Sequence, residues 1–218
     1  MSALVSLTPA GDLAVEEPLP RFTAAARQPL GLEWYRTPLP PGALKRLHAR
    51  SDFLGGVQTL GYLACLAVPA AVAIRGGLRG EWAWAVGGLF TYGIVASFLI
   101  NAVHELGHNT VFKPAWLNTW FCRLFAFLGW INHELFGVSH VRHHRYTLHP
   151  PDDDENPLPI RFTIRDFVRG FLFNYRFLVF SVQKTVRLAR GRFEGQWEHT
   201  LYPAGRPELA RPAIRWSR

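Results

Sequence analysis

Two long stretches without a charged residue constrain the fold more than any other feature of the sequence. Residues 53–74 read FLGGVQTLGYLACLAVPAAVAI, and residues 82–103 read WAWAVGGLFTYGIVASFLINAV. Each stretch is about 20 residues long, which is the length an α-helix needs to cross a hydrocarbon core of about 30 Å. The turn between them, RGGLRGE at residues 75–81, is charged and rich in glycine. We therefore predict an all-α integral membrane protein built on a transmembrane helical hairpin; the alternative is two buried core helices of a soluble protein.

The cationic residues around these stretches predict how the hairpin is oriented. The turn between the two predicted spans carries Arg75 and Arg79. The opposite side of the hairpin, where both chain ends lie, carries more cations. These are Arg36, Lys45, Arg46 and Arg50 before the first span, and Lys113 and many arginines after the second. Lys and Arg are enriched in cytoplasmic segments close to membrane spans. We therefore expect both chain ends, and everything after residue 103, to be cytosolic.

The remaining regions give the predicted domain organisation. Residues 1–50 lack a signal peptide and carry scattered Pro, Gly and charge, which predicts a mobile leader. Residues 51–182 are predicted to form the membrane domain, and residues 183–218 a basic C-terminal segment. Residues 116–131, WLNTWFCRLFAFLGWI, are aromatic but short and are interrupted by Arg123. They predict a helix that lies in the membrane interface or enters it partway. Cys65 and Cys122 are expected to be free thiols.

A second sequence pattern also predicts contact with lipid. The chain has 24 Lys and Arg against 16 Asp and Glu, a net charge of +8. Six arginines recur on one stripe at about 100° per residue, with apolar residues roughly opposite. The arginines are Arg161, Arg165, Arg169, Arg176, Arg187 and Arg190, and the apolar residues are Phe167, Phe171, Leu178 and Val182. This predicts a basic amphipathic helix on an anionic leaflet, with an ordinary solvated helix as the alternative. Because a lipid surface explains the basic residues, we expect no nucleic-acid partner.

Histidines are concentrated where the second apolar stretch ends. Six of the nine histidines fall between residues 104 and 144. On a helix, His104 and His108 share one face, and His140, His143 and His144 share another. Two such faces beside a predicted membrane boundary predict a metal site with these five histidines as ligands. Imidazole binds zinc, iron, copper and nickel, but five imidazoles exceed what one tetrahedral zinc needs. The number therefore favours two metal ions, with iron as the redox-active choice.

The first histidine pair also fits a different chemistry. HELGH at residues 104–108 matches H-E-x-x-H, in which two histidines hold zinc and the glutamate is the general base of a metalloprotease. An intramembrane protease with Glu105 as base is therefore an alternative. That reading leaves the second histidine set at residues 140–144 without a role.

The two motifs together resemble the histidine boxes of the membrane fatty acid desaturase and hydroxylase superfamily. The first box is HELGH at residues 104–108, followed by Asn109 as in many acyl-lipid and sphingolipid desaturases. The second is HVRHH at residues 140–144, continued by Arg145, Tyr146 and Thr147. The resemblance covers about residues 50–160. It implies a di-iron centre on the cytosolic side, held by histidines of both boxes.

The resemblance also implies the reaction and its partners. Dioxygen and two external electrons would remove hydrogen from an acyl-lipid chain, giving a double bond in a desaturase or an alcohol in a lipid or alkyl hydroxylase. The electrons would come from a separate protein of the cytochrome b5, ferredoxin or rubredoxin type. Glu105 would orient a histidine rather than bind metal, and Asp152 or Asp154 would accept a hydrogen bond from a box histidine.

A third box, which the superfamily carries further downstream, is absent from this sequence. His133, His149 and His199 are the remaining candidates for extra ligands, although their spacing places them on no shared face with the boxes. We therefore expect a chain truncated before the third box, with an incomplete ligand set. A non-catalytic remnant of such an enzyme is the third hypothesis.

Overall fold

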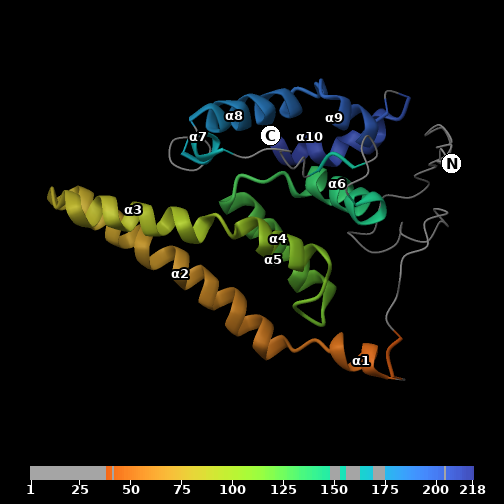
Figure 1. The fold of residues 1–218 in the computed structure, drawn as a ribbon, viewed down its shortest axis with the longest axis horizontal. Coiled ribbons are helices and arrows are strands. Elements are labelled where there is room, and N and C mark those ends of the chain that lie inside the picture. The colour runs from red at the N-terminus through yellow and green to blue at the C-terminus, as the bar shows by residue number, and fades with distance from the viewer. Residues whose placement is uncertain (1–37, 41, 148–152, 156–162, 169–174, 204) are drawn as a thin grey trace.

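The computed structural model describes residues 38–40, 42–147, 153–155, 163–168, 175–203 and 205–218. Within these residues the chain is helical and contains no strand, so the predicted all-α class is confirmed. The order of elements along the chain is α1 (Ala43–Leu47), α2 (Asp52–Arg79), α3 (Trp82–Ala96), α4 (Leu99–Gly107), α5 (Ala115–Leu128), α6 (His133–Tyr146), α7 (Ile164–Phe167), α8 (Tyr175–Ala189), α9 (Gln196–Leu201), the 3-10 helix η4 (Pro207–Ala210) and α10 (Arg211–Ser217). In Figure 1, α2 and α3 project together from one end of the molecule, and α4 and α5 lie near the base of this pair.

The predicted hairpin forms, with helices somewhat longer than the uncharged stretches. Ser51 starts α2 by accepting a hydrogen bond from the Leu54 N–H at 3.3 Å. Gly80 ends α2 with φ of 73°, a left-handed conformation that favours glycine. After the turn, α3 and α4 are separated by a break at residues 97–98 but together form one apolar span of 26 residues. Two helices are thus long and apolar enough to cross a membrane, as the sequence predicts.

Two glycines allow the helices of the hairpin to pack closely. A Cβ at Gly76 would lie 2.6 Å from the backbone nitrogen of Ala85, and one at Gly88 would lie 2.6 Å from that of Ala73. Further toward α4, the Tyr62 hydroxyl donates a hydrogen bond to the Val95 carbonyl at 2.8 Å. The backbones of α2 and α3 therefore meet where side chains larger than hydrogen do not fit, as is common between helices in lipid.

The surface of the hairpin is apolar and exposed. In the most apolar windows of the two spans, only 17% and 11% of the residues are buried in the protein. Large exposed side chains include Phe53, Leu60, Val68, Ile74, Leu78, Trp82, Leu89 and Phe90. A core helix of a soluble protein would bury such residues. The two helices are therefore not buried core helices, and the hairpin presents the surface expected of lipid-contacting helices.

Helix α5 follows the first histidine box and packs against α4. Its inner face buries Phe121, Phe125 and Ala126 in a core that also contains Leu99, Val103 and Leu106 of α4. Its outer face exposes Trp116, Trp120 and Phe127, with Arg123 on the same side. A helix of 14 residues is about 21 Å long, which is too short to cross a membrane. The exposed aromatic face agrees with the predicted interfacial position.

The turn into α5 is held by one buried amide. Asn118, which has 0% exposure, accepts a hydrogen bond from the Phe112 N–H at 2.9 Å and donates to the Phe112 carbonyl at 2.8 Å. At the same turn, the Lys113 N–H donates to Asp52 Oδ1 at the start of α2. The first histidine box is therefore anchored to both neighbouring helices by polar contacts.

We expect Asn118→Ala to destabilise the fold by about 2–4 kcal/mol, because it leaves a buried N–H and a buried carbonyl without their partner. The unfolding midpoint of the detergent-solubilised protein measures this loss. Thr119→Ala is the control, since Thr119 is a neighbour on α5 whose hydroxyl bonds at an exposed position to the Ala115 carbonyl of the same helix. Equal shifts for the two variants would contradict the anchoring role.

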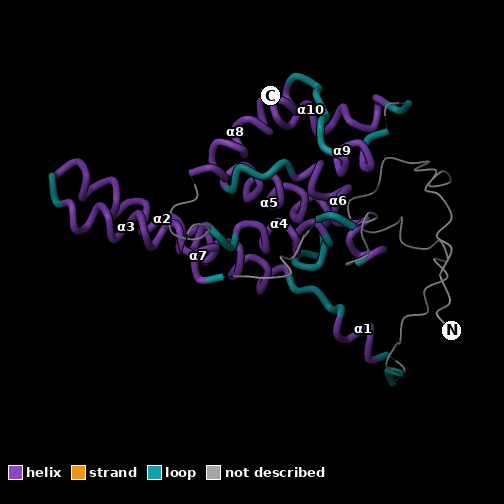
Figure 2. Tube along the Cα trace, turned by 45° about the horizontal axis from the view of Figure 1, so that its top comes forward, coloured by secondary structure: helices purple, strands orange, loops and turns teal. Residues whose placement is uncertain are grey.

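The C-terminal helices form a second core against α6. Leu135 of α6 packs with Leu188, Leu201, Tyr202, Ala210 and Ala213. The amide of Asn132 donates to the Ala213 carbonyl, and the Trp216 indole donates to the Ile131 carbonyl at 2.9 Å. Figure 2 shows α8, α9 and α10 gathered on the same side of the molecule as α6. Helices of residues 183–218 thus pack against α6 and stabilise the helix that carries the second histidine box. Of the predicted basic helix the structure describes α7 and α8, whereas Arg161, Arg169 and Phe171 lie outside the described residues.

Candidate metal centre

The first histidine box lies where the second apolar span ends. His104 is in the last turn of α4, and His108 is the residue that ends the helix. The next residue, Asn109, has φ of 58°, which stops the helix and turns the chain. Arg50 fixes this turn by donating to the Asn109 carbonyl at 2.9 Å. Both imidazoles are therefore held at the end of the apolar span, next to an anchored turn.

The second box lies on the middle and last turns of α6. Asn132 caps this helix by accepting a hydrogen bond from the Leu135 N–H at 2.9 Å. Trp197 of α9 donates to Ser139 Oγ at 3.1 Å, which ties the same turn to the C-terminal segment. The ring of Phe136 stacks on His140 with 5.0 Å between centroids. The helical period then places His140 and His144 on the side that faces α4.

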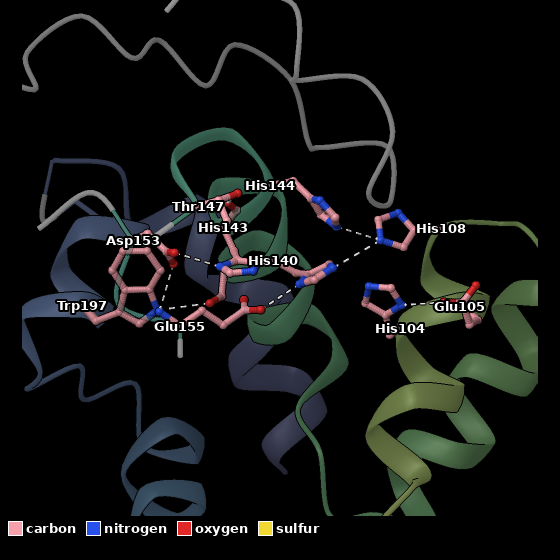
Figure 3. A network of polar contacts seen from close by, with 11 residues as sticks. His104, Glu105, His108, His140, His143, His144, Thr147, Asp153, Glu155 and Trp197 are labelled. Atoms are coloured by element: carbon pink, nitrogen blue, oxygen red, sulfur yellow. Dashed lines mark hydrogen bonds and ion pairs between the residues drawn. The ribbon is translucent and has the colours of Figure 1, made fainter. Parts of the chain in front are cut away.

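Four imidazoles from the two boxes meet at one point. The candidate ligand atoms of His104, His108, His140 and His144 all lie within 4.8 Å of one another. His108 Nε2 is 3.2 Å from His140 Nε2 and 3.1 Å from His144 Nε2 (Figure 3). Two nitrogens bound about 2.1 Å from one ion are roughly 3.0–3.4 Å apart in octahedral or tetrahedral geometry. The four side chains therefore fit a shared metal ion.

Carboxylates contact the Nδ1 atom of three of the box histidines. Glu105 Oε1 lies 2.9 Å from His104 Nδ1, and its other oxygen accepts from the Thr110 hydroxyl at 3.1 Å. Glu155 Oε1 lies 2.7 Å from His140 Nδ1, and Asp153 Oδ2 lies 2.8 Å from His143 Nδ1 (Figure 3). A carboxylate on Nδ1 fixes the ring and leaves Nε2 to bind metal. The acidic residues that do this after the second box are thus Asp153 and Glu155.

Of the two acidic residues selected from the sequence after the second box, the structure describes only Asp154, and no contact between Asp154 and a described histidine is seen. Asp152 lies outside the described residues, and Asp154 is exposed between the two carboxylates that contact the histidines. The sequence analysis predicts this contact from Asp152 or Asp154, and the structure shows such contacts from Asp153 and Glu155. Within this run Asp153 is buried and Glu155 half-buried, whereas Asp154 is exposed, and no sequence signal separates them.

We expect Glu155→Gln to weaken metal binding by about 10-fold or more, because the neutral amide no longer supports the charge of a metal-bound His140. Titration of the purified apoprotein with Co²⁺, followed by its visible absorption, measures the change. Asp154→Asn is the matched control, since it removes the same charge from the adjacent exposed position. A similar loss in both variants would show that only net charge matters.

The other predicted ligands are placed apart from this cluster or are not described. His143 lies on α6 with its ring 6.0 Å from that of His144, but it is outside the four-nitrogen group. His133 packs on Trp216 with 4.2 Å between ring centroids and contacts Glu134. His199 is exposed on α9, and His149 lies outside the described residues. The five predicted ligands thus divide into four that converge and His143, which Asp153 orients separately.

The electrostatics of the cluster favour neutral imidazoles. Burial, with the neighbouring His104, His144 and His140, lowers the pKa of His108 to about 4. Burial, followed by His140 and His104, also lowers the pKa of His144. Both imidazoles are therefore neutral at neutral pH, and metal binding requires the neutral form.

Comparison with known protein families identifies the group to which this site belongs. The family model described as fatty acid desaturase matches residues 80–217, a range that includes both histidine boxes and helices α8 to α10. The chain belongs to the fatty acid desaturase family. Neither the curated proteins nor the solved structures contain a match to the chain.

In this desaturase-family chain a cleft lies next to the first histidine box. The cleft has a volume of about 560 Å³ and lies between the start of α2 and α4. Its walls include Leu54, Tyr62, Phe98, Ala102, Leu106 and Phe125, and its polar end is formed by Arg50, Glu105 and Thr110. Glu105 is also the residue that contacts His104. The cleft is therefore mostly apolar and ends one side chain away from the four imidazoles.

Proposed function

We propose that this chain is an iron-dependent oxidoreductase that introduces a double bond into the acyl chain of a lipid. In the overall reaction, –CH2–CH2– and O2, with two electrons and two protons, give –CH=CH– and two molecules of water. The observation that carries the proposal is the convergence of His104, His108, His140 and His144 at the end of an apolar span. Membership of the desaturase family supports the same reaction class.

The residues of the site have separate roles in this proposal. His104, His108, His140 and His144 would hold one iron ion, and His143, oriented by Asp153, offers a ligand for the second ion of a di-iron centre. Activation of dioxygen, which removal of hydrogen from an unactivated carbon requires, is the chemistry that the bound iron supplies. The cleft between α2 and α4 would hold the acyl chain, because its walls are mostly apolar and include Glu105, which contacts His104.

Position and partners follow from the same arrangement. With the hairpin in a membrane, both boxes would lie at one end of the spans, and the cationic flanks favour the cytosolic side for that end. The electrons would come from a separate protein of the cytochrome b5, ferredoxin or rubredoxin type. A hydroxylase would use the same ligands and the same cleft, and the product distinguishes it from a desaturase.

The zinc protease is the candidate from another class, and the position of Glu105 disfavours it. A general base has to face the metal-bound water. Glu105 instead lies on the far side of His104 from the other imidazoles, where it also accepts a hydrogen bond from Thr110 (Figure 3). The protease also gives no role to His140 and His144, which complete the cluster.

The test combines metal content with product analysis. The purified chain is reconstituted in lipid vesicles with NADPH, a ferredoxin reductase and ferredoxin, and the acyl products are analysed by gas chromatography and mass spectrometry. Bound iron together with an unsaturated product supports the proposal, and an added hydroxyl group assigns the hydroxylase. Zinc as the bound metal, together with peptide cleavage that Glu105→Gln abolishes, would overturn it.

A further inference from the structure

Helix α8 exposes most of its large apolar side chains, with Leu188 as a buried exception, and turns Thr185, Lys184 and Arg187 toward the protein. Leu178, Val179, Phe180, Val182 and Val186 are each at least 41% exposed. On the inner side, Thr185 accepts a hydrogen bond from the Trp130 indole at 3.0 Å, and Lys184 and Arg187 contact Glu198 of α9. In water, an amphipathic helix has the opposite arrangement, with apolar residues inside. The exposed surface of α8 is therefore suited to an apolar environment rather than to water.

The apolar and cationic residues of α8 are also separated along its length. Most of the exposed apolar residues fall at positions 178–182, whereas Arg187, Arg190 and Arg192 lie at and just beyond the carboxy-terminal end. In both views the amino-terminal end of α8 lies toward the side from which the α2–α3 pair projects, and its other end lies toward α9 (Figures 1 and 2). The apolar end of α8 thus points in the same direction as the apolar hairpin.

The cationic end offers groups for an anionic partner. Arg187 is paired with Glu194 at 2.8 Å, but Arg190 and Arg192 are exposed and form no ion pair with a described residue. They border a groove of about 600 Å³ whose other walls include Phe180, Val182 and Val186. A groove with apolar walls and an arginine edge matches the chemistry of a phospholipid, which joins an acyl chain to a phosphate.

An aromatic residue marks the boundary between the two parts. Trp130, which is 65% exposed, bonds Thr185 where the apolar half of α8 gives way to the cationic end. It also continues the exposed row of Trp116, Trp120 and Phe127 on α5. Tryptophans collect at the level of lipid headgroups, where an apolar ring and a polar N–H are both accommodated.

We propose that α8 enters the same leaflet of the membrane from which the hairpin emerges. Its amino-terminal half contacts acyl chains, Trp130 lies at the interface, and Arg190 and Arg192 bind the phosphates of anionic phospholipids. The helix has 15 residues and is about 22 Å long, so it enters one leaflet and does not cross the bilayer. The lipid contact proposed for α8 does not depend on the metal centre or on the proposed reaction.

The depth of α8 is measured with an environment-sensitive fluorophore on single cysteines. Leu178→Cys, Val182→Cys and Arg190→Cys are made in a Cys65→Ala, Cys122→Ala background, labelled, and reconstituted in vesicles of phosphatidylcholine and phosphatidylglycerol. Leu60→Cys on the exposed face of α2 is the membrane control, and Glu208→Cys on η4 is the exposed control. Helical content and metal binding verify that each variant is folded.

The expected result is quenching by spin labels on the acyl chains at positions 178 and 182, as at 60, and quenching by headgroup labels at 190. Quenching by aqueous iodide at 178 and 182, to the level seen at 208, would overturn the proposal. Protection from both quenchers would also overturn it, because α8 would then be covered by protein, such as a second copy of the chain.

The charge requirement has its own test. Association with spin-labelled phosphatidylglycerol, relative to phosphatidylcholine, is expected to fall about fivefold for each cation removed by Arg190→Gln and Arg192→Gln, the factor that corresponds to about 1 kcal/mol per charge. Lys45→Gln with Arg46→Gln on α1 is the matched control for net charge. An equal fall in both double variants would overturn the assignment of the phosphate site to the end of α8.

Discussion

Replacement of His108 by alanine is expected to abolish metal binding and activity together. His108 Nε2 lies 3.2 Å from His140 Nε2 and 3.1 Å from His144 Nε2. Its loss therefore removes the ligand that is close to both of these imidazoles. We expect the affinity for iron to fall by more than about 100-fold, above the range seen when the outer partners of metal ligands are removed. Metal content measured by mass spectrometry after purification reports the effect independently of activity.

His199→Ala is the control for this variant, because His199 is exposed on α9 and lies outside the four-nitrogen group. It should keep the metal content of the unmodified chain. Full iron content in the His108→Ala protein would contradict the assignment of His108 as a ligand. Loss of iron in both variants would point to general destabilisation, which the helical content measured by circular dichroism would reveal.

The second large effect is expected at the crossing of the membrane helices. In Gly88→Val the Cβ alone would lie 2.6 Å from the Ala73 nitrogen and 2.8 Å from the Pro69 carbonyl oxygen. Because both contacts are to backbone, α2 and α3 have to move apart, at a cost of about 3 kcal/mol or more. The start of α2 and α4 together line the cleft beside Glu105, so we expect the midpoint of thermal unfolding and the acyl-chain affinity both to fall.

Gly87→Val provides a matched control one residue away. No heavy atom lies within 4 Å of a Cβ at Gly87, so the same substitution meets open space there. Its unfolding midpoint should stay close to that of the unmodified chain. If the two variants unfold alike, a general effect of valine in α3 would explain the result and the close helix crossing would not.

The features that local sequence rules describe were predictable. The hairpin follows from the length of two uncharged stretches, and the two imidazole faces follow from helical spacing of His104 with His108 and of His140 with His144. The meeting of these faces in space also follows, because both boxes have to lie on one side of the spans. Three histidines on one face did not reveal that His143 is held apart by Asp153, since that depends on the path of the chain after α6.

Contacts between distant segments could not be predicted from the sequence. Asn132 bonds to Ala213 and Trp216 bonds to Ile131, and no local pattern predicts that the C-terminal helices return to support α6. The arginine periodicity of residues 161–190 predicts an amphipathic helix but not which side faces the protein. In the structure, Thr185 bonds to Trp130 and Arg187 contacts Glu198, so the polar side of α8 faces the protein. Leu178 and Val182 are then left exposed.

The central claim is that imidazoles from α4 and α6 hold the same iron. X-ray absorption at the iron edge of the purified protein tests it directly, through the number of imidazole nitrogens around the metal. We expect imidazole nitrogens around the iron of the unmodified chain, and loss of bound iron both in His104→Ala with His108→Ala and in His140→Ala with His144→Ala. A full complement of iron in either double variant, or zinc as the bound metal, would contradict it.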